Sequence, residues 1–238
     1  MLYKSRKYKK VSPVWLDTLK ISKSRLNRAG LADSTYYSQE ETIRMCSFEP
    51  KNLIDKRDRA AVAMLFLSSM RVSALTSIRV DNIDLAAMTI YQNPADGVRT
   101  KNGKSMETIL LPIEFLLGIC EEWYTELKQE IGENALWYPT LSTDGLRFSK
   151  SEMVGDVDSR NKSLRDGVNR LCKYAGIRYL SPHKFRRGHG VYAVEHSPSL
   201  KEFEAYSQNM GHENVATTFI YYSKLANNVV KDTILNRK

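Results

Sequence analysis

The stretch that most constrains the fold runs from Asp58 to Met70. Its middle part, residues 60–67, reads Ala-Ala-Val-Ala-Met-Leu-Phe-Leu and is apolar on nearly every side of a helix. A helix of this kind is stable only when other elements surround it. The sequence therefore predicts a central buried helix with the rest of the chain packed around it.

Further helices are predicted by apolar residues at helical spacing and by residues typical of helix ends. They are expected after the Ser38-Gln-Glu-Glu capping sequence, over 113–131, before Gly176, after Pro182, over 200–210, around Tyr221 and over 226–238. Glycines at 132, 176 and 211 mark three of the ends. Trp123 lies on the apolar stripe of 113–131, so we expect it in the core rather than stacked on a base.

Strand signals are confined to Leu85–Pro112. Residues 88–92, 98–101 and 106–111 are β-prone, and Asn102-Gly103 between the last two is a strong hairpin signal. We expect an antiparallel sheet of about three strands with Lys101 near the hairpin tip. The predicted fold class is mainly α with a small antiparallel β-sheet (α+β).

Positive charge is concentrated at the start of the chain. Residues 1–30 hold nine Lys and Arg residues against one Asp, a charge of +8, which leaves +1 of the total of +9 for the remainder. A basic arm beside a nearly neutral body suggests a polyanionic partner such as DNA, although a solvated linker has the same composition. We expect two parts, an arm or linker over 1–30 and a domain over 31–238.

The three cysteines, Cys46, Cys120 and Cys172, are far apart and match no metal-binding or disulfide pattern. This usage is typical of a reducing compartment. No apolar run is long enough for a signal sequence or a membrane span. A cytoplasmic, nucleoid-associated protein without membrane attachment is expected.

Residues able to act on a phosphate gather near the end of the chain. His183 and Arg186 are three positions apart, so both side chains lie on one helix face, which Ser181 can cap and Pro182 can begin. Met210-Gly211-His212 follows, and Tyr221 comes nine residues after His212. The set offers cationic donors, titratable imidazoles and a phenol nucleophile.

This set of motifs resembles the tyrosine recombinase (phage integrase) family, in which His-x-x-Arg, a Leu-Gly-His-like element and a nucleophilic Tyr follow in this order. The family's first Arg, about 110 residues upstream, matches Arg71 in Ser69-Met-Arg-Val-Ser. Its hairpin lysine matches Lys101, with Lys104 as the rival. The resemblance covers roughly residues 33–225 and implies the tyrosine recombinase catalytic-domain fold.

The resemblance also implies an activity, strand cleavage and rejoining through a 3′-phosphotyrosyl bond. Arg71 and Arg186 would stabilise the transition state, His183 would act as base and acid, and His212 would bind a phosphate oxygen. Lys101 would protonate the leaving 5′-oxygen, and Tyr221 would be the nucleophile. Neither a metal nor another cofactor is implied.

The resemblance implies double-stranded DNA as the partner. It also implies that the protein assembles into a homotetramer on DNA and is a monomer or weak oligomer when free. In this family a C-terminal helix commonly docks on a neighbouring protomer, and 226–238 can do so or fold back on its own core. A separate DNA-gripping domain normally precedes the catalytic domain, and 30 residues are too few to form it. We therefore expect either an excised domain with its linker or an unusually short protein.

Alternatives remain open at this stage. Arg71 could cap helix carbonyls, and Tyr222 rather than Tyr221 could enter the site, because adjacent residues point about 100° apart on a helix. A type IB topoisomerase has the same nucleophile and arginine clamp. A DNA-binding remnant with an idle tyrosine would also retain these motifs.

Three positions depart from the family pattern. Ala74 stands where an acidic residue usually supports the site, Ser69 replaces a common Gly, and Arg187 stands where a second His is frequent. The loss of the acidic residue is expected to slow the chemistry unless another group compensates.

Overall fold

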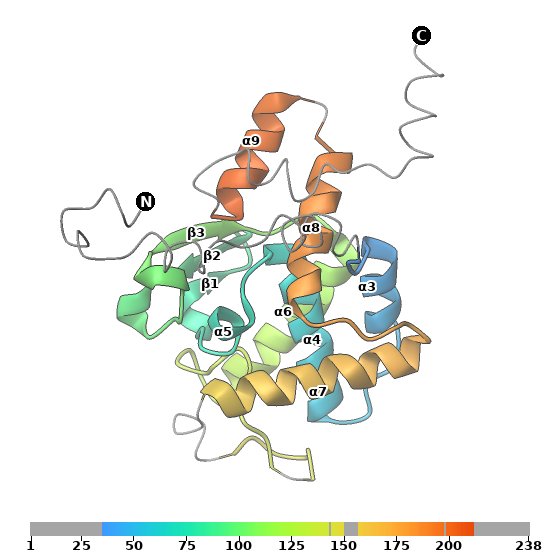
Figure 1. Cartoon of the computed structure of the whole chain (residues 1–238). Coiled ribbons are helices and arrows are strands. Elements are labelled where there is room, and N and C mark those ends of the chain that lie inside the picture. The colour runs from blue at the N-terminus through green and yellow to red at the C-terminus, as the bar shows by residue number, and fades with distance from the viewer. Residues whose placement is uncertain (1–34, 143, 150–156, 198, 212–238) are drawn as a thin grey trace, which may run out of the picture. The chain divides into compact units, whose positions relative to one another are not determined.

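The computed structural model describes residues 35–142, 144–149, 157–197 and 199–211. The chain divides into two units between Thr35 and Tyr36, and the account below concerns the second, Tyr36–Lys238. Its described part contains helices and one small sheet (Figure 1).

The described elements confirm a mainly α fold with a small antiparallel sheet. The helices are α3 (Gln39–Cys46), α4 (Leu53–Ser68), α5 (Val72–Leu75), α6 (Glu114–Glu130), α7 (Val157–Ala175), α8 (His183–Glu195) and α9 (Leu200–Asn209). The strands are β1 (Ile83–Asp84), β2 (Thr89–Gln92) and β3 (Met106–Ile109). Short 3₁₀ turns are η3 (Val80–Asn82), η4 (Pro94–Asp96) and η5 (Lys101–Gly103).

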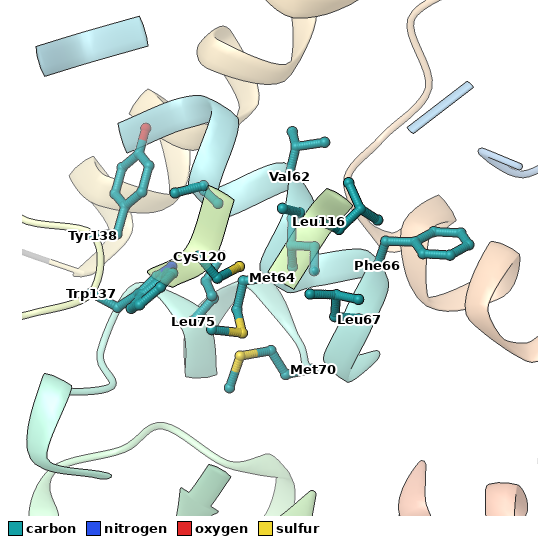
Figure 2. Packing of buried hydrophobic residues seen from close by; sticks show 14 of the residues in the cluster. Val62, Met64, Phe66, Leu67, Met70, Leu75, Leu116, Cys120, Trp137 and Tyr138 are labelled. Carbon is teal, nitrogen blue, oxygen red and sulfur yellow. The ribbon is translucent and has the colours of Figure 1, made fainter. Parts of the chain in front are cut away.

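Helix α4 is the predicted central helix, and α3, α6, α7 and α8 pack against it. It begins earlier than expected because the Asn52 side chain caps it by accepting a hydrogen bond from Asp55 N at 2.9 Å. It ends at Ser68 rather than Met70 because Ser69 is left-handed, with φ 54°. Figure 2 shows side chains of α4 and α6 gathered with Trp137 and Tyr138 in one buried cluster.

The sheet has the order β1-β2-β3, and Gln92 of β2 lies opposite Met106 of β3. The strand expected over 98–101 is wrong. Pro94 cannot donate a backbone hydrogen bond, and Gly97 is left-handed with φ 85°, so the chain turns away after β2. Val98 is instead buried in the core. Leu111 N donates to Leu67 O at 3.0 Å and ties the chain after β3 to the end of α4.

Two local predictions, a helix start at Ser38 and a core position for Trp123, are confirmed. Ser38 and Glu41 form a capping box at the start of α3. Trp123 is buried, and its indole donates to Trp137 O at 2.9 Å, so it belongs to the core. All three cysteines are buried and unpaired. In the part of the chain that the structure describes, no helix is long and apolar enough to cross a membrane.

Candidate active site

The turn after α4 presents Arg71. The Ser68 hydroxyl donates to Met64 O at 2.6 Å and accepts from Met70 N at 3.2 Å, which holds the chain as it reverses through the left-handed Ser69. Met70 is buried, so Arg71 emerges at the start of α5 with its side chain partly exposed. A glycine would adopt the Ser69 conformation without strain, which explains why the family often has one here.

The Arg71 guanidinium is available for a ligand. Within residues 35–211, leaving aside the three undescribed gaps, its side chain makes no hydrogen bond or ion pair. The alternative that Arg71 caps helix carbonyls therefore finds no support in this structure.

Arg186 lies beneath this turn. It is buried, and its two terminal nitrogens donate to backbone oxygens, Nη1 to Ser69 O at 2.8 Å and Nη2 to Met210 O. One guanidinium thus joins the turn that presents Arg71 to the turn that precedes His212.

Helix α8, which carries Arg186, is locked against the chain before α3. A Cβ atom at Gly188 would lie 1.9 Å from Tyr37 O, so only glycine allows this approach. The Tyr37 ring stacks on Phe185 with centroids 4.3 Å apart. The predicted cap by Ser181 is not observed, because Pro182 takes the N-cap position and no side chain caps the helix.

His183, at the start of α8, is exposed beside these arginines. Its pKa is lowered from the ordinary value, first by partial loss of hydration and then by the positive charges of Arg186, Arg71 and Lys184. The structure therefore brings Arg71, His183 and Arg186 together at the C-terminal end of α4. Because its pKa is lowered, the imidazole is neutral at pH 7 and can accept a proton.

Sequence reasoning missed two polar residues near this group, His189 and Asn209. His189 is fully buried one turn after Arg186, and its Nδ1 contacts Phe66 O at 2.8 Å, so Nδ1 carries the proton. Its helical spacing from Arg186 was the available signal. Asn209 immediately precedes the Met210-Gly211 turn, and its partner lies 100 positions away in the chain.

Among the described residues, the structure does not bring Lys101 together with the arginines. Lys101 and Lys104 are exposed on and just after η5, where Asn102 and Gly103 are left-handed with φ 61° and 63°. No contact among the described residues joins Lys101 to Arg71 or Arg186. His212, Tyr221, Tyr222 and the helix expected over 226–238 lie outside the described residues.

No group of three or more His, Cys, Asp or Glu residues that could hold a metal ion occurs in the described segments.

The sequence from 36 to 228 matches the phage integrase family. The chain belongs to that family. Among curated integrase-family relatives, it is 24% identical to the tyrosine recombinase XerC of Histophilus somni over 184 residues, 76% of this chain and 54% of the relative. It is 26% identical to the tyrosine recombinase XerA of Thermococcus kodakarensis, over 77% of this chain and 56% of the relative. The chain thus spans about half the length of the curated relatives it matches.

Solved structures of recombinases share the fold. The crystal structure of XerA recombinase matches with a TM-score of 0.59 at 20% identity, over 87% of this chain and 65% of that one. The XerH site-specific recombinase bound to difH matches with a TM-score of 0.54 at 16% identity, over 85% of this chain and 53% of that one. The tyrosine recombinase catalytic-domain fold is therefore confirmed.

The structure also shows where two of the departures from the family pattern lie. Ala74 is buried in α5, so this position supplies no carboxylate to Arg71. Arg187 is partly buried, and its positive charge acts on Tyr36. In this integrase-family chain the described neighbours whose charges act on His183 are all positive.

Proposed function

We propose that this chain is the catalytic part of a site-specific DNA recombinase that cleaves and rejoins strands through a covalent 3′-phosphotyrosyl intermediate. The observation that carries the proposal is the meeting of Arg71, His183 and Arg186 at one end of α4 in a phage integrase fold. A cluster of cations with hydrogen-bond donors suits the phosphate of a DNA backbone.

The arginines are assigned to charge stabilisation. Attack at phosphorus spreads negative charge over the non-bridging oxygens, and a guanidinium can donate to two of them at once. Arg71 has no competing partner among the described residues. Arg186 is assigned to the same phosphate from its buried position beside the Arg71 turn. His212 is assigned to a further phosphate oxygen.

His183 is the proposed general base. A phenol has a pKa of about 10 and is a poor nucleophile at pH 7 until its proton is removed. The lowered pKa of His183 keeps its imidazole neutral, so it can take the proton of Tyr221. In the reverse step the same imidazole returns that proton to the phenolate oxygen.

The leaving group of the proposed cleavage is the 5′-oxygen of the DNA. The Tyr221 oxygen forms a bond to phosphorus, the bond from phosphorus to the 5′-oxygen breaks, and Lys101 gives that oxygen a proton. The phosphotyrosyl ester retains the energy of the broken bond, so rejoining proceeds without ATP. Lys104 is the alternative acid on the same hairpin.

We propose double-stranded DNA as the partner and a homotetramer as the assembly that exchanges strands. Two features support DNA: the charge of +8 over residues 1–30 and the fold shared with the XerH recombinase that was solved on difH DNA. In this assignment residues 1–30 are a basic arm and 31–238 the catalytic domain. Binding to chromosomal DNA would place the protein at the nucleoid.

The test is covalent trapping on a pool of nicked duplexes of random sequence, in which cleavage beside the nick releases a short fragment and prevents rejoining. Wild-type protein should form an SDS-stable adduct with DNA, as should Tyr222→Phe, whereas Tyr221→Phe should not. Loss of the adduct only in Tyr222→Phe would overturn the assignment of the nucleophile. No adduct with the wild type would reject the enzyme in favour of a DNA-binding remnant.

A plasmid assay separates the recombinase from a topoisomerase. Once a cleaved sequence has been recovered from the adduct, two copies of it on one supercoiled plasmid should recombine. Relaxation of that plasmid without exchange between the copies would identify a type IB topoisomerase instead.

A further inference from the structure

Helix α9 ends against the outer edge of the sheet, above β3 in Figure 1. Its last residue, Asn209, makes two hydrogen bonds to one residue of that strand. Ile109 N donates to Asn209 Oδ1 at 2.6 Å, and Asn209 Nδ2 donates to Ile109 O at 2.8 Å. The carboxamide thus pairs with Ile109 as a neighbouring strand would.

The residues after Asn209 are held by two further contacts. Met210 O accepts a hydrogen bond from the buried Arg186. Gly211 is left-handed with φ 67°, and a Cβ atom there would lie 3.0 Å from Met106 Cε. The segment that leads to His212 is therefore held between β3 on one side and Arg186 on the other.

The strand that Asn209 pairs with leads from the lysine hairpin. Met106 begins β3 directly after the turn that carries Lys101 and Lys104. The same strand contacts Gly211 through Met106 and Asn209 through Ile109. Through Arg186 and Ser69 O the chain of contacts continues to the turn of Arg71.

We propose that Asn209 is a positioning residue, which holds the hairpin bearing the general-acid lysine in register with the Met210-Gly211 turn. This inference rests on the proposed function. Both bonds of Asn209 are solvent-exposed, so they add little to global stability. Their effect is directional, because a shift of about 1 Å in a catalytic group can cost about 100-fold in rate.

A substrate with sulfur in place of the 5′-bridging oxygen isolates the lysine's task. The phosphorus–sulfur bond breaks to give a thiolate, which is a much weaker base than an alkoxide and needs no proton from the enzyme. Attack by the tyrosine and stabilisation by the arginines are still required. A defect confined to the general acid therefore disappears on the sulfur substrate.

The experiment measures single-turnover adduct formation by the full chain on matched oxygen and sulfur substrates. Asn209→Leu is expected to slow cleavage of the oxygen substrate about 10- to 100-fold. On the sulfur substrate it should approach the wild-type rate. Lys101→Ala, or Lys104→Ala if that lysine is the acid, should show the same pattern.

Two further variants separate positioning from folding. Asn209→Asp keeps the size and the acceptor for Ile109 N but sets a carboxylate oxygen against Ile109 O, so it should also be slow only on the oxygen substrate. Gln208→Leu removes an exposed carboxamide next to Asn209 and should match the wild type on both substrates.

The outcomes are distinct. Cleavage of the oxygen substrate by Asn209→Leu at the wild-type rate would overturn the inference. Equal slowing of Asn209→Leu and Asn209→Asp on both substrates would also overturn it, because the residue would then support the fold or the arginines. Failure of the wild type on both substrates would instead overturn the proposed function on which the inference rests.

Discussion

The two ends of α4 handle charge in opposite ways. At its N-terminal end the buried Asp58 accepts hydrogen bonds from Arg57 Nε at 3.1 Å, Tyr138 Oη at 2.7 Å and Arg170 Nη2 at 2.7 Å. At its C-terminal end Arg186 donates to backbone oxygens, and the charges acting on His183 are positive. Each cation of the first end has an anion beside it, whereas the second end concentrates cations.

This difference indicates what each end is for. The opposite charges of a buried ion pair neutralise each other within the protein, so these groups are unavailable to a ligand. Cations held close together repel one another and do not favour folding, so this end suits an anion from outside the protein. The same helix thus carries a structural network at one end and a candidate phosphate site at the other.

The largest expected effect is at the structural end. Asp58→Asn leaves Arg57 without its counter-charge in the core and leaves Arg170 with only the longer pair to Asp55 at 3.7 Å, which should lower the free energy of unfolding by about 3–5 kcal/mol. Urea unfolding measures this change, with the exposed Asp81→Asn as the matched control. Adduct formation per folded molecule should stay at the wild-type level. If Asp58→Asn lowered adduct formation without lowering stability, the N-terminal end of α4 would not be purely structural.

At the other end the effect should appear in the rate. Arg71→Ala is expected to slow adduct formation about 100- to 1000-fold, equivalent to about 3–4 kcal/mol in the barrier, and to leave stability nearly unchanged. Arg44→Ala, on the exposed side of α3, is the matched control. Unfolding of Arg71→Ala at markedly lower urea concentration would show that this end, too, is structural.

A smaller effect concerns pH. Burial lowers the pKa of His189 from 6.5 to about 4. Between these values the unfolded chain binds more protons than the folded one, so the free energy of unfolding should fall as the pH decreases from about 6.5 to about 4. The loss should reach about 3 kcal/mol at the lower limit. It is measured by urea unfolding across this pH range.

The matched variant for this prediction is His189→Gln, in which the share of the pH dependence due to residue 189 should vanish. His183 also has a lowered pKa and titrates in the same direction, so part of the dependence should remain. An unchanged slope in His189→Gln would contradict the assignment of a buried neutral imidazole.

The smallest effect is expected on the surface of α4. Lys56 and Glu126 form an ion pair at 2.9 Å, with 44% and 26% of their side chains exposed. Such pairs contribute about 0–1 kcal/mol, so Lys56→Ala should shift the urea midpoint only slightly. A loss comparable to that of Asp58→Asn would mean that burial does not decide the strength of these pairs.

The predictable part of the fold rests on local signals. The apolar run 60–67, the capping box at Ser38 and the glycines that end α6, α7 and α9 each act through neighbours within a turn or two. The 98–101 strand was wrong because the β2–β3 pairing, set by contacts across the sheet, leaves those residues in a long connection. The start of α4 was predicted too late because its first turns contain polar residues, so no apolar pattern marks the cap at Asn52.

The candidate site follows the same division. His183 and Arg186 were predicted together because their spacing lies within one helical turn, and Arg71 because a family motif marks it. The contacts that organise them were not predictable. Arg186 meets Ser69 O across 117 positions, His189 meets Phe66 O across 123, and Asn209 meets Ile109 across 100. Such long-range pairs depend on the packing of whole elements, which no local pattern encodes.

The burial of every cysteine has a practical consequence. Burial raises the pKa of Cys46 to about 12 and also raises the pKa values of Cys120 and Cys172, so their thiols stay protonated and shielded from reagents at pH 7. A cysteine introduced at an exposed site of β3, such as Glu107, would therefore be the group that a maleimide dye or spin label modifies. The natural chain is thus ready for spectroscopic distance measurements without prior removal of its own sulfur atoms.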